Sequence, residues 1–238
     1  MSSKEDFSLF KNLLPKNVLC LNSDIVKSGG RCIIVGGWVR DRLLDIPITP
    51  KVGDIDIEVF GLTYNHLYSI CLNYGIKARY QNFGVIKLNH MDISLPRTEV
   101  VVGKKYNDFK VNLNPYLTFK QAAFRRDFSV NAIGWDLLMN VVLDPFGGIN
   151  AVKEKVLIPL SEHFKEDNYR VLRAIQLIAR FNFRASNLLI KFARTMDPRV
   201  VSQKHLNKTK TILQTSQHKK SVMFFLEKIG KHWKNLFA

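Results

Sequence analysis

Polar and apolar residues alternate strictly in one short stretch in the first quarter of the chain. In the segment Asp54–Phe60, acidic positions alternate with aliphatic ones, which predicts a strand with one buried face. The acidic side chains on its polar face are those of Asp54, Asp56 and Glu58. A continuous apolar run at 32–35 predicts a second strand, and the spacing that follows predicts a helix over Trp38–Leu44.

The remaining periodic segments indicate an α+β protein. Two hairpins are expected, Phe83–Leu88 with Met91–Leu95 and Val130–Leu138 with Val141–Leu143. Helical spacing predicts further helices at Lys4–Leu14, Leu62–Tyr74 and Phe119–Arg125. Two segments are expected to be loops: the stretch from Pro15 to Gly30, and the polar stretch Val101–Leu117.

From Glu166 onward the pattern is helical throughout. We expect helices at Asn168–Phe181, Asn187–Thr195, Val200–Gln214 and Ser221–Phe237. The change from mixed α/β to all-α near residue 155 predicts two domains, one at 1–155 with a mixed sheet and one at 156–238 made of helices.

Composition places the chain among folded proteins that do not span a membrane. Its 238 residues are 46% hydrophobic and include 16 Phe, which is too apolar for a disordered chain. No stretch approaches the roughly 20 apolar residues that a membrane span needs. Residues 1–14 carry early charges and no apolar core, so we expect neither a signal nor a transit peptide, and a cytoplasmic location.

Positive charge is in excess and is concentrated towards the C-terminus. The 36 Lys and Arg against 20 Asp and Glu give a formal net charge of +16, and residues 191–238 hold 11 basic and two acidic residues. One explanation is a basic surface that is solvated. The more specific hypothesis is an arm that binds the phosphates of a nucleic acid. The lysines that we expect to bind RNA are Lys204, Lys208, Lys210, Lys219 and Lys220.

The glycine pair Gly36-Gly37 separates the first predicted strand from its helix. Glycines let the backbone approach an anion closely, and the start of a helix offers free N–H groups. Arg40, one turn into the helix, can add a guanidinium to a phosphate. Taken alone the pair is weak evidence, because two glycines before a helix are common turn chemistry.

The paired carboxylates of Asp54 and Asp56 are more specific. Both point from the same face of one strand, which is costly unless a cation neutralises them. Oxygen ligands of this kind suit Mg²⁺, whereas the alternative is an acidic strand edge that faces solvent. We interpret Glu58, on the same face, as an exposed side chain rather than a third ligand. Asp92, in the first hairpin, is a further carboxylate that could approach the metal.

A first arginine motif runs from Arg125 to Ala132. Arg125 and Arg126, with the carboxylate of Asp127, suit a clamp for phosphate and ribose. Asn131 adds both a donor and an acceptor. The alternative is a structural Arg–Asp pair that orients a loop.

A second motif begins the predicted helix near residue 167. Asp167 and Arg170 are three residues apart and share one helix face, which Arg173 continues. A carboxylate that accepts hydrogen bonds, next to a guanidinium that donates them, can hydrogen-bond to the edge of a nucleobase. The alternative is an ordinary salt bridge at a helix start.

In this order the four elements resemble the class II tRNA nucleotidyltransferases (CCA-adding enzymes) and bacterial poly(A) polymerases. The matching motifs are Gly36 to Asp41 with Asp54-Ile55-Asp56, Arg125 to Ala132, and Glu166, Asp167 and Arg170. Phe83 to Val85 and Asp92 to Arg97 resemble one bacterial branch. The resemblance implies a polymerase-β-like nucleotidyltransferase head at 1–155, followed by a helical neck and a reduced, basic, RNA-binding body at 156–238.

The resemblance also implies the chemistry. Asp54 and Asp56 would hold two Mg²⁺ ions, and the RNA 3′-hydroxyl would attack the α-phosphorus of CTP or ATP with release of pyrophosphate. Phosphates would be held by Gly36, Gly37, Arg40, Arg125 and Arg126, and the sugar would lie near Asp127 and Asn131. Asp167 and Arg170, supported by Arg173, would select the base.

Two features depart from the family pattern. Gln176 stands where many relatives carry a further Arg, and many relatives run well beyond 238 residues with helical body and tail domains that grip tRNA. We expect the basic helices after Val200 to substitute for those domains, and a homo-oligomer or a helper subunit stays open as an addition.

The resemblance therefore implies a tRNA nucleotidyltransferase that adds C, C and A to the tRNA 3′ end. The segment 101–117 corresponds to the loop that controls the change from C to A addition in the family, which favours full CCA addition. The alternatives are a poly(A) polymerase, a partial enzyme that adds only C or only A, and an inactive RNA-binding relative.

Overall fold

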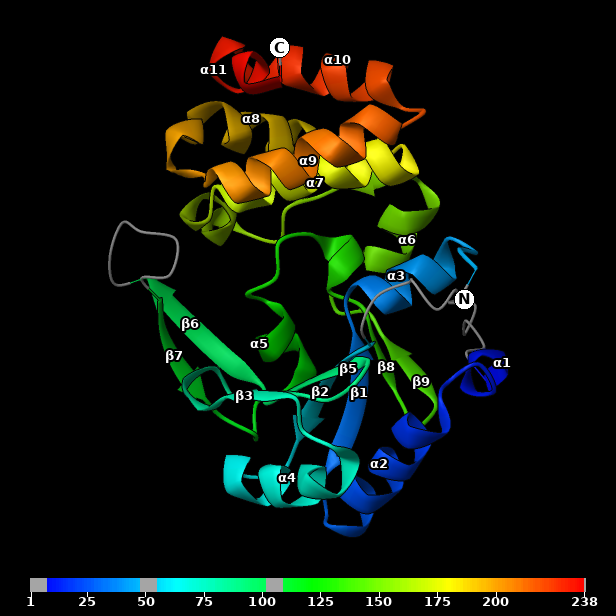
Figure 1. The fold of residues 1–238 in the computed structure, drawn as a ribbon. Coiled ribbons are helices and arrows are strands. Elements are labelled where there is room, and N and C mark those ends of the chain that lie inside the picture. Colours follow the sequence, from blue (N-terminus) through cyan, green and yellow to red (C-terminus); the bar gives the residue numbers. More distant parts are fainter. Residues whose placement is uncertain (1–7, 48–54, 102–108, 238) are drawn as a thin grey trace.

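A mixed seven-stranded sheet forms the centre of the head, as the computed structural model shows for residues 8–47, 55–101 and 109–237 (Figure 1). The strand order is β3-β4-β5-β2-β1-β8-β9. Only β2 and β5 pair in parallel, and the other neighbours are antiparallel. The strands are β1 (Arg31–Val35), β2 (Ile55–Phe60), β3 (Ala78–Tyr80), β4 (Val85–Lys87), β5 (Met91–Ser94), β8 (Gly134–Asp136) and β9 (Val141–Leu143).

Two shorter pairings stand beside this sheet. The antiparallel ribbon of β6 (Arg97–Val101) and β7 (Phe109–Leu113) projects from one side of the head (Figure 1). The parallel pair of β10 (Val156–Leu157) and β11 (Arg184–Ala185) joins the end of the head to the helical part. The sheet therefore has one projecting ribbon, and a short second sheet marks the transition to the helices.

Helices cover both faces of the sheet because alternate residues of β1 point to opposite sides. Cys32 and Ile34 belong to the main core with the buried residues of α2 (Lys16–Lys27) and α4 (Tyr64–Cys71), whereas Ile33 and Val35 pack with Ala122 of α5 (Phe119–Ala123). The remaining helices of this part are α1 (Ser8–Lys11), α3 (Gly37–Leu43) and α6 (Gly148–Lys153).

The last third of the chain is mainly a stack of helices above the head (Figure 1). It consists of α7 (Tyr169–Phe181), α8 (Asn187–Thr195), α9 (Gln203–Thr215), α10 (Lys219–Ile229) and α11 (Lys231–Lys234). The core continues into it, since the ring of Phe164 lies 5.3 Å from that of Phe128 and 6.1 Å from that of Phe192. No helix in the described part of the chain is long and apolar enough to cross a membrane.

Short 3₁₀ turns fill several of the connections. They span Leu72–Tyr74, Gln81–Phe83, Ser129–Asn131, Glu162–Glu166, Pro198–Val200 and Asn235–Phe237. The turn at Ser129–Asn131 lies inside the first arginine motif, and the turn at Glu162–Glu166 ends just before Asp167. Asn131 and Asp167 are therefore presented from irregular backbone, whereas Arg170 and Arg173 lie on α7.

The predicted fold class is confirmed, with three local corrections. Residues 16–27 form α2 rather than a loop, because Val18, Leu21 and Ile25 recur at helical spacing and are fully buried. The segment expected as a loop at 101–117 contains β7, which pairs with β6. The last predicted helix is broken at Gly230, whose φ of +114° lies outside the helical region.

Candidate active site

A polar cleft of about 480 Å³ opens between the sheet and the start of α7. The motifs that the sequence singled out come together in its lining. The predicted residues that line it are Gly36, Gly37, Asp56, Asp92, Arg125, Arg126, Asp127, Asn131, Asp167, Arg170 and Arg173. Asp54 lies outside the described residues, and Arg40 is not part of the lining.

Two carboxylates stand side by side on neighbouring strands of this cleft. Asp56 of β2 and Asp92 of β5 are directly paired in the parallel register, and both line the cleft. Nζ of Lys87 lies 2.6 Å from a carboxylate oxygen of Asp92. No group of three or more His, Cys, Asp or Glu suited to a metal ion occurs within the described ranges, which exclude Asp54.

Gly36 leaves the space between these carboxylates and the arginines open. It caps α3 with a φ of +72°, a conformation that favours glycine. A Cβ at this position would lie 3.4 Å from Nη1 of Arg126 and 3.7 Å from Oδ2 of Asp56. A side chain here would therefore fill the gap between a cation and a carboxylate. This open space and the oxygen donors of Asp56 and Asp92 fit Mg²⁺ chemistry.

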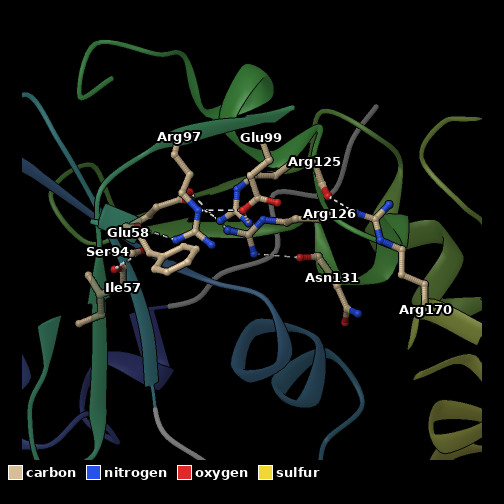
Figure 2. A network of polar contacts seen from close by, with 10 residues as sticks. Ile57, Glu58, Ser94, Arg97, Glu99, Arg125, Arg126, Asn131 and Arg170 are labelled. Atoms are coloured by element: carbon tan, nitrogen blue, oxygen red, sulfur yellow. Dashed lines mark hydrogen bonds and ion pairs between the residues drawn. The ribbon is translucent and has the colours of Figure 1, made fainter. Parts of the chain in front are cut away.

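Glu58 is not an exposed side chain, so our interpretation of that residue is wrong. It is completely buried, and its two carboxylate oxygens accept hydrogen bonds from Arg125 and Arg126 at 3.4 and 3.3 Å (Figure 2). Strand alternation did put Glu58 on the acidic face, but that face is covered at this point by the arginine motif. Glu58 thus fixes two cations in the cleft.

The β6–β7 ribbon supplies two charged cleft residues for which we had predicted no role, Arg97 and Glu99, and the apolar Val111. Nε of Arg97 donates to Glu99 at 2.8 Å, and Nη1 of Arg125 reaches the same oxygen at 3.2 Å (Figure 2). Burial opposes ionisation of Glu99, yet Arg125 and Arg97 together bring its pKa below the ordinary value. The spacing of two residues on one strand was the signal that both side chains share a face.

Asp127 is the centre of a second network. Its Oδ1 accepts hydrogen bonds from the Phe128 N–H and from Nδ2 of Asn131, both at 2.9 Å, and its Oδ2 lies 2.5 Å from Nε of Arg173. Burial would raise the pKa of Asp127, but Arg173 and these donors hold it below the ordinary value. Asp127 therefore holds Arg173, whose own side chain is 57% exposed, towards the cleft.

Arg40 lies behind the cleft, where we had expected a ligand of phosphate. Its side chain is almost buried and donates to Asp41 at 2.6 and 2.9 Å and to Oδ1 of Asn131 at 2.5 Å. The guanidinium also lies over the ring of Phe181, 5.1 Å from its centroid. This placement makes Arg40 a support for Asn131 and for the contact between α3 and α7.

The second motif also lines the cleft, and its polar atoms are partly engaged. Arg170 donates to the carbonyl oxygens of His163 and Arg125 at 2.8 and 2.9 Å, and its Nε lies 4.0 Å from Asp167. Asp167 accepts from the Tyr169 N–H at 2.9 Å, and burial raises the pKa of its carboxyl group. The carbonyl contact ties this helix start to the first arginine motif.

The predicted RNA-binding lysines lie outside the cleft. Lys204 and Lys208 are exposed on α9, Lys210 is half-buried there, and Lys219 and Lys220 are exposed at the start of α10. They are thus on α9 and α10, which lie above α7 in Figure 1.

A mixed sheet with carboxylates and arginines in one cleft, capped by a helical stack, is the architecture of a nucleotidyltransferase head and neck. The family model of the poly A polymerase head domain matches residues 32–158, more than half of the chain, and the chain belongs to this family. This membership confirms the family resemblance seen in the sequence motifs.

Curated relatives carry the name Multifunctional CCA protein. The protein from Xylella fastidiosa (strain 9a5c) is 39% identical over 149 residues, which are 62% of this chain and 34% of that protein. The protein from Haemophilus ducreyi is 35% identical over 151 residues, 63% of this chain and 35% of that protein. The match thus spans about a third of the length of these relatives.

Solved structures share the fold over nearly the whole chain. An apo form (form II) of a CCA-adding enzyme has a TM-score of 0.72 and 26% identity, covering 96% of this chain and 57% of that chain. The Thermotoga maritima CCA-adding enzyme complexed with tRNA has a TM-score of 0.68 and 24% identity, covering 96% and 55%. The similarity therefore includes the helical stack as well as the head.

Proposed function

We propose that this protein is a nucleotidyltransferase that adds C, C and A to the 3′ end of tRNA from CTP and ATP. The observation that carries the proposal is the meeting of four separate motifs in one cleft, from Gly36 at the N-cap of α3 to Arg173 on α7. The names of the relatives and of the solved neighbours, which are CCA proteins and CCA-adding enzymes, support the substrate.

Asp54 and Asp56 would hold the Mg²⁺ ions that the family implies, and Asp92 lies next to Asp56 on the neighbouring strand. When bound, the metal supplies charge stabilisation for the triphosphate and lowers the pKa of the attacking hydroxyl. The residues that the structure describes fit this role through their oxygen donors and the open space at Gly36.

The protein's own residues would orient the two reactants. Arg125 and Arg126, fixed by Glu58, would bind the triphosphate, and Asp127 and Asn131 would lie near the ribose. The 3′-oxygen of the RNA forms a bond to the α-phosphorus while the bond to pyrophosphate breaks and the hydroxyl proton leaves. Half-buried cations that are already held in place by Glu58 need little reorganisation during this step.

Base selection would fall to the start of α7. Asp167 offers an acceptor, while Arg170 and Arg173 offer donors, on one side of the cleft. A carboxylate and a guanidinium can together recognise the edge of cytosine and then of adenine without a nucleic-acid template. The basic helices after Val200, with Lys204, Lys208, Lys210, Lys219 and Lys220, would bind the tRNA phosphates.

A second candidate is poly(A) addition or partial addition of C or A alone. The description of the matched family, a poly A polymerase head domain, favours keeping it. The match covers about a third of the length of the curated relatives. The proposal therefore includes a second copy of the chain or a helper subunit as a partner. A division into a catalytic part at 1–155 and an RNA-binding part at 156–238 belongs to the same proposal.

Three measurements on the wild type and on Asp56→Ala test the proposal. They are binding of CTP and ATP with and without Mg²⁺, turnover, and affinity for RNA. We expect Mg²⁺-dependent binding by the wild-type chain, and a loss of turnover of about a thousandfold in the variant, because several kcal/mol of charge stabilisation is removed. RNA affinity should stay unchanged, and the same result is expected for Asp54→Ala. Turnover that survives both substitutions would contradict the metal assignment.

A further inference from the structure

A second, larger groove lies in the helical part of the molecule. It encloses about 1400 Å³ between the end of α6, the β10–β11 pair, the end of α7, α8 and α10. It begins at Ile178, which is about 12 Å further along α7 than Arg170 at a rise of 1.5 Å per residue. The groove is therefore separate from the cleft that holds the nucleotidyltransferase motifs.

The charge around this groove is strongly one-sided. Among the described residues in its lining, seven are Lys or Arg, and all seven are exposed, whereas Glu154 is the one acidic member. Six of these cations are Lys153, Lys155, Arg184, Lys191, Arg194 and Lys220. Such a density of cations favours a polyanionic partner, and a flexible chain of phosphates can reach cations that come from four separate segments.

A single aromatic ring stands out in this basic surface. Phe224 on α10 is 61% exposed, and Nζ of Lys228, the seventh cation, lies 5.2 Å from the centroid of its ring. At the floor Ile178, Phe183 and Phe225 are at most 2% exposed, and Ile190 of α8 is half-buried, so Phe224 is the one large apolar side chain of the described lining that is exposed. A helix that docks by its apolar face needs several open anchors, whereas one ring beside cations suits the stacking of a nucleobase.

Lys155 is held in a conformation that favours glycine. Its φ is +51° at the position just after the C-cap of α6, where helices usually end with glycine. The carbonyl of Lys155 accepts a hydrogen bond of 2.7 Å from the Arg184 N–H, which fixes this strand end at the groove. A long charged side chain at a strained position points to a use for its charge.

We propose that this groove is an RNA-binding site, which takes the phosphates of an RNA strand on its cations and stacks one unpaired base on Phe224. The inference rests on the proposed function, because an enzyme that extends tRNA must hold RNA beyond its 3′ end. It also assigns part of that binding to α8, β11 and the end of α6, which extends the RNA surface beyond the lysines on α9 and at the start of α10.

Lys155→Gly is the sharpest test, because it removes a cation and relieves backbone strain at once. We expect a melting temperature that is unchanged or higher. Affinity for a fluorescent tRNA transcript without its CCA end should fall about fivefold to tenfold at about 0.1 M salt, and the salt slope should fall by about 1. Lost affinity in a chain at least as stable as the wild type cannot result from unfolding.

Phe224→Ala tests the stacking part, and Lys77→Ala is the control for the loss of an exposed cation in Lys155→Gly. The alanine at 224 should weaken binding of the same transcript about tenfold without changing its salt slope. Lys77 is exposed on the head outside both grooves, and its loss should change affinity less than twofold. The same affinity measurement with a 15-nucleotide oligo(U) distinguishes binding of a single strand from binding of the folded tRNA.

The outcomes distinguish this inference from the proposed function. Unchanged RNA affinity in both groove variants, while the wild-type chain still incorporates nucleotides, would overturn the groove assignment alone. Groove variants that leave RNA affinity intact but change the molecular mass in light scattering would make the groove a contact between two copies of the chain, and would also overturn it. No incorporation by the wild type, with RNA affinity that depends on Lys155, would overturn the proposed function alone.

Discussion

At the scale of single residues, the acidic strand β2 shows what an alternating pattern can predict about a side chain and what it cannot. Alternation correctly put Asp56 and Glu58 on the same face of β2, yet their surroundings differ. Asp56 is exposed in the cleft, whereas Glu58 is buried under Arg125 and Arg126. The pattern gives the direction of a side chain but not what covers it, because the cover comes from residues 67 and 68 positions away in the chain.

The ion pair of Asp127 makes stability depend on pH. Its carboxyl group has a lowered pKa in the folded chain, so its contribution is present above the ordinary Asp value and is lost as pH falls through the lower folded value. Asp127→Asn should therefore reduce the free energy of unfolding by about 1–3 kcal/mol at pH 7. In urea titrations the difference from the wild type should shrink as the pH approaches 3.

Asp197→Asn is the control for this prediction. Asp197 also forms an ion pair, with Arg199, but both side chains are exposed, at 42% and 88%. Pairs of this kind add little to stability because solvent screens them. A loss in Asp127→Asn that stays constant from pH 7 to pH 3 would contradict the role given to its charge.

At the scale of elements, the strands and helices that carry motifs were predictable, and those defined by long-range contacts were less so. The β1 strand, α3, β2 and both hairpins follow from local patterns and turn residues. The α2 helix was missed because Pro15 and the later glycines suggested a loop, although Pro15 sits at its N-cap. The β7 strand was missed because its apolar positions alternate within a polar segment.

Gly36 tests how the start of α3 shapes the site. Gly36→Ala would put a Cβ within 3.4 Å of Arg126 in a residue with φ +72°. We expect a loss of about 1–3 kcal/mol in the free energy of unfolding from the strained backbone, and a loss of nucleotide binding. Urea unfolding and titration with CTP measure the two effects.

Gly75→Ala separates backbone strain from loss of space. Gly75 also has a positive φ, +70°, but a Cβ there meets nothing within 4 Å. The substitution should lower stability by about 1 kcal/mol and leave CTP binding intact. Equal CTP binding by the two alanine variants would mean that Gly36 does not keep the cleft open.

At the scale of the whole molecule, one core joins the sheet to the helices. The rings of Phe128, Phe164 and Phe192 form a continuous contact from the first arginine motif to α8. Arg170 and Arg173 add polar contacts to the same head segment. The division near residue 155 remains a prediction about roles, and this packing makes cooperative unfolding of both parts the expected behaviour.

Trp233→Ala tests this cooperativity. Trp233 is fully buried near the C-terminus, and its Nε1 donates to the Ala193 carbonyl at 3.0 Å. Its loss should lower the free energy of unfolding by about 3–5 kcal/mol. Trp38 and Trp135, whose rings stack at 5.8 Å in the head, would report the same shift by fluorescence. A head transition that stays at the wild-type urea concentration would show two independently folding parts.

The proposed addition of C, C and A is tested most directly by incorporation of nucleotides into one tRNA transcript that lacks its 3′ end. The reaction is run with Mg²⁺ and CTP alone, ATP alone or both, and the products are resolved at single-nucleotide resolution. We expect two C residues with CTP alone, and two C residues followed by one A, with no further extension, when both nucleotides are present. A long A ladder would establish the poly(A) alternative, and no incorporation by the folded chain would contradict the account.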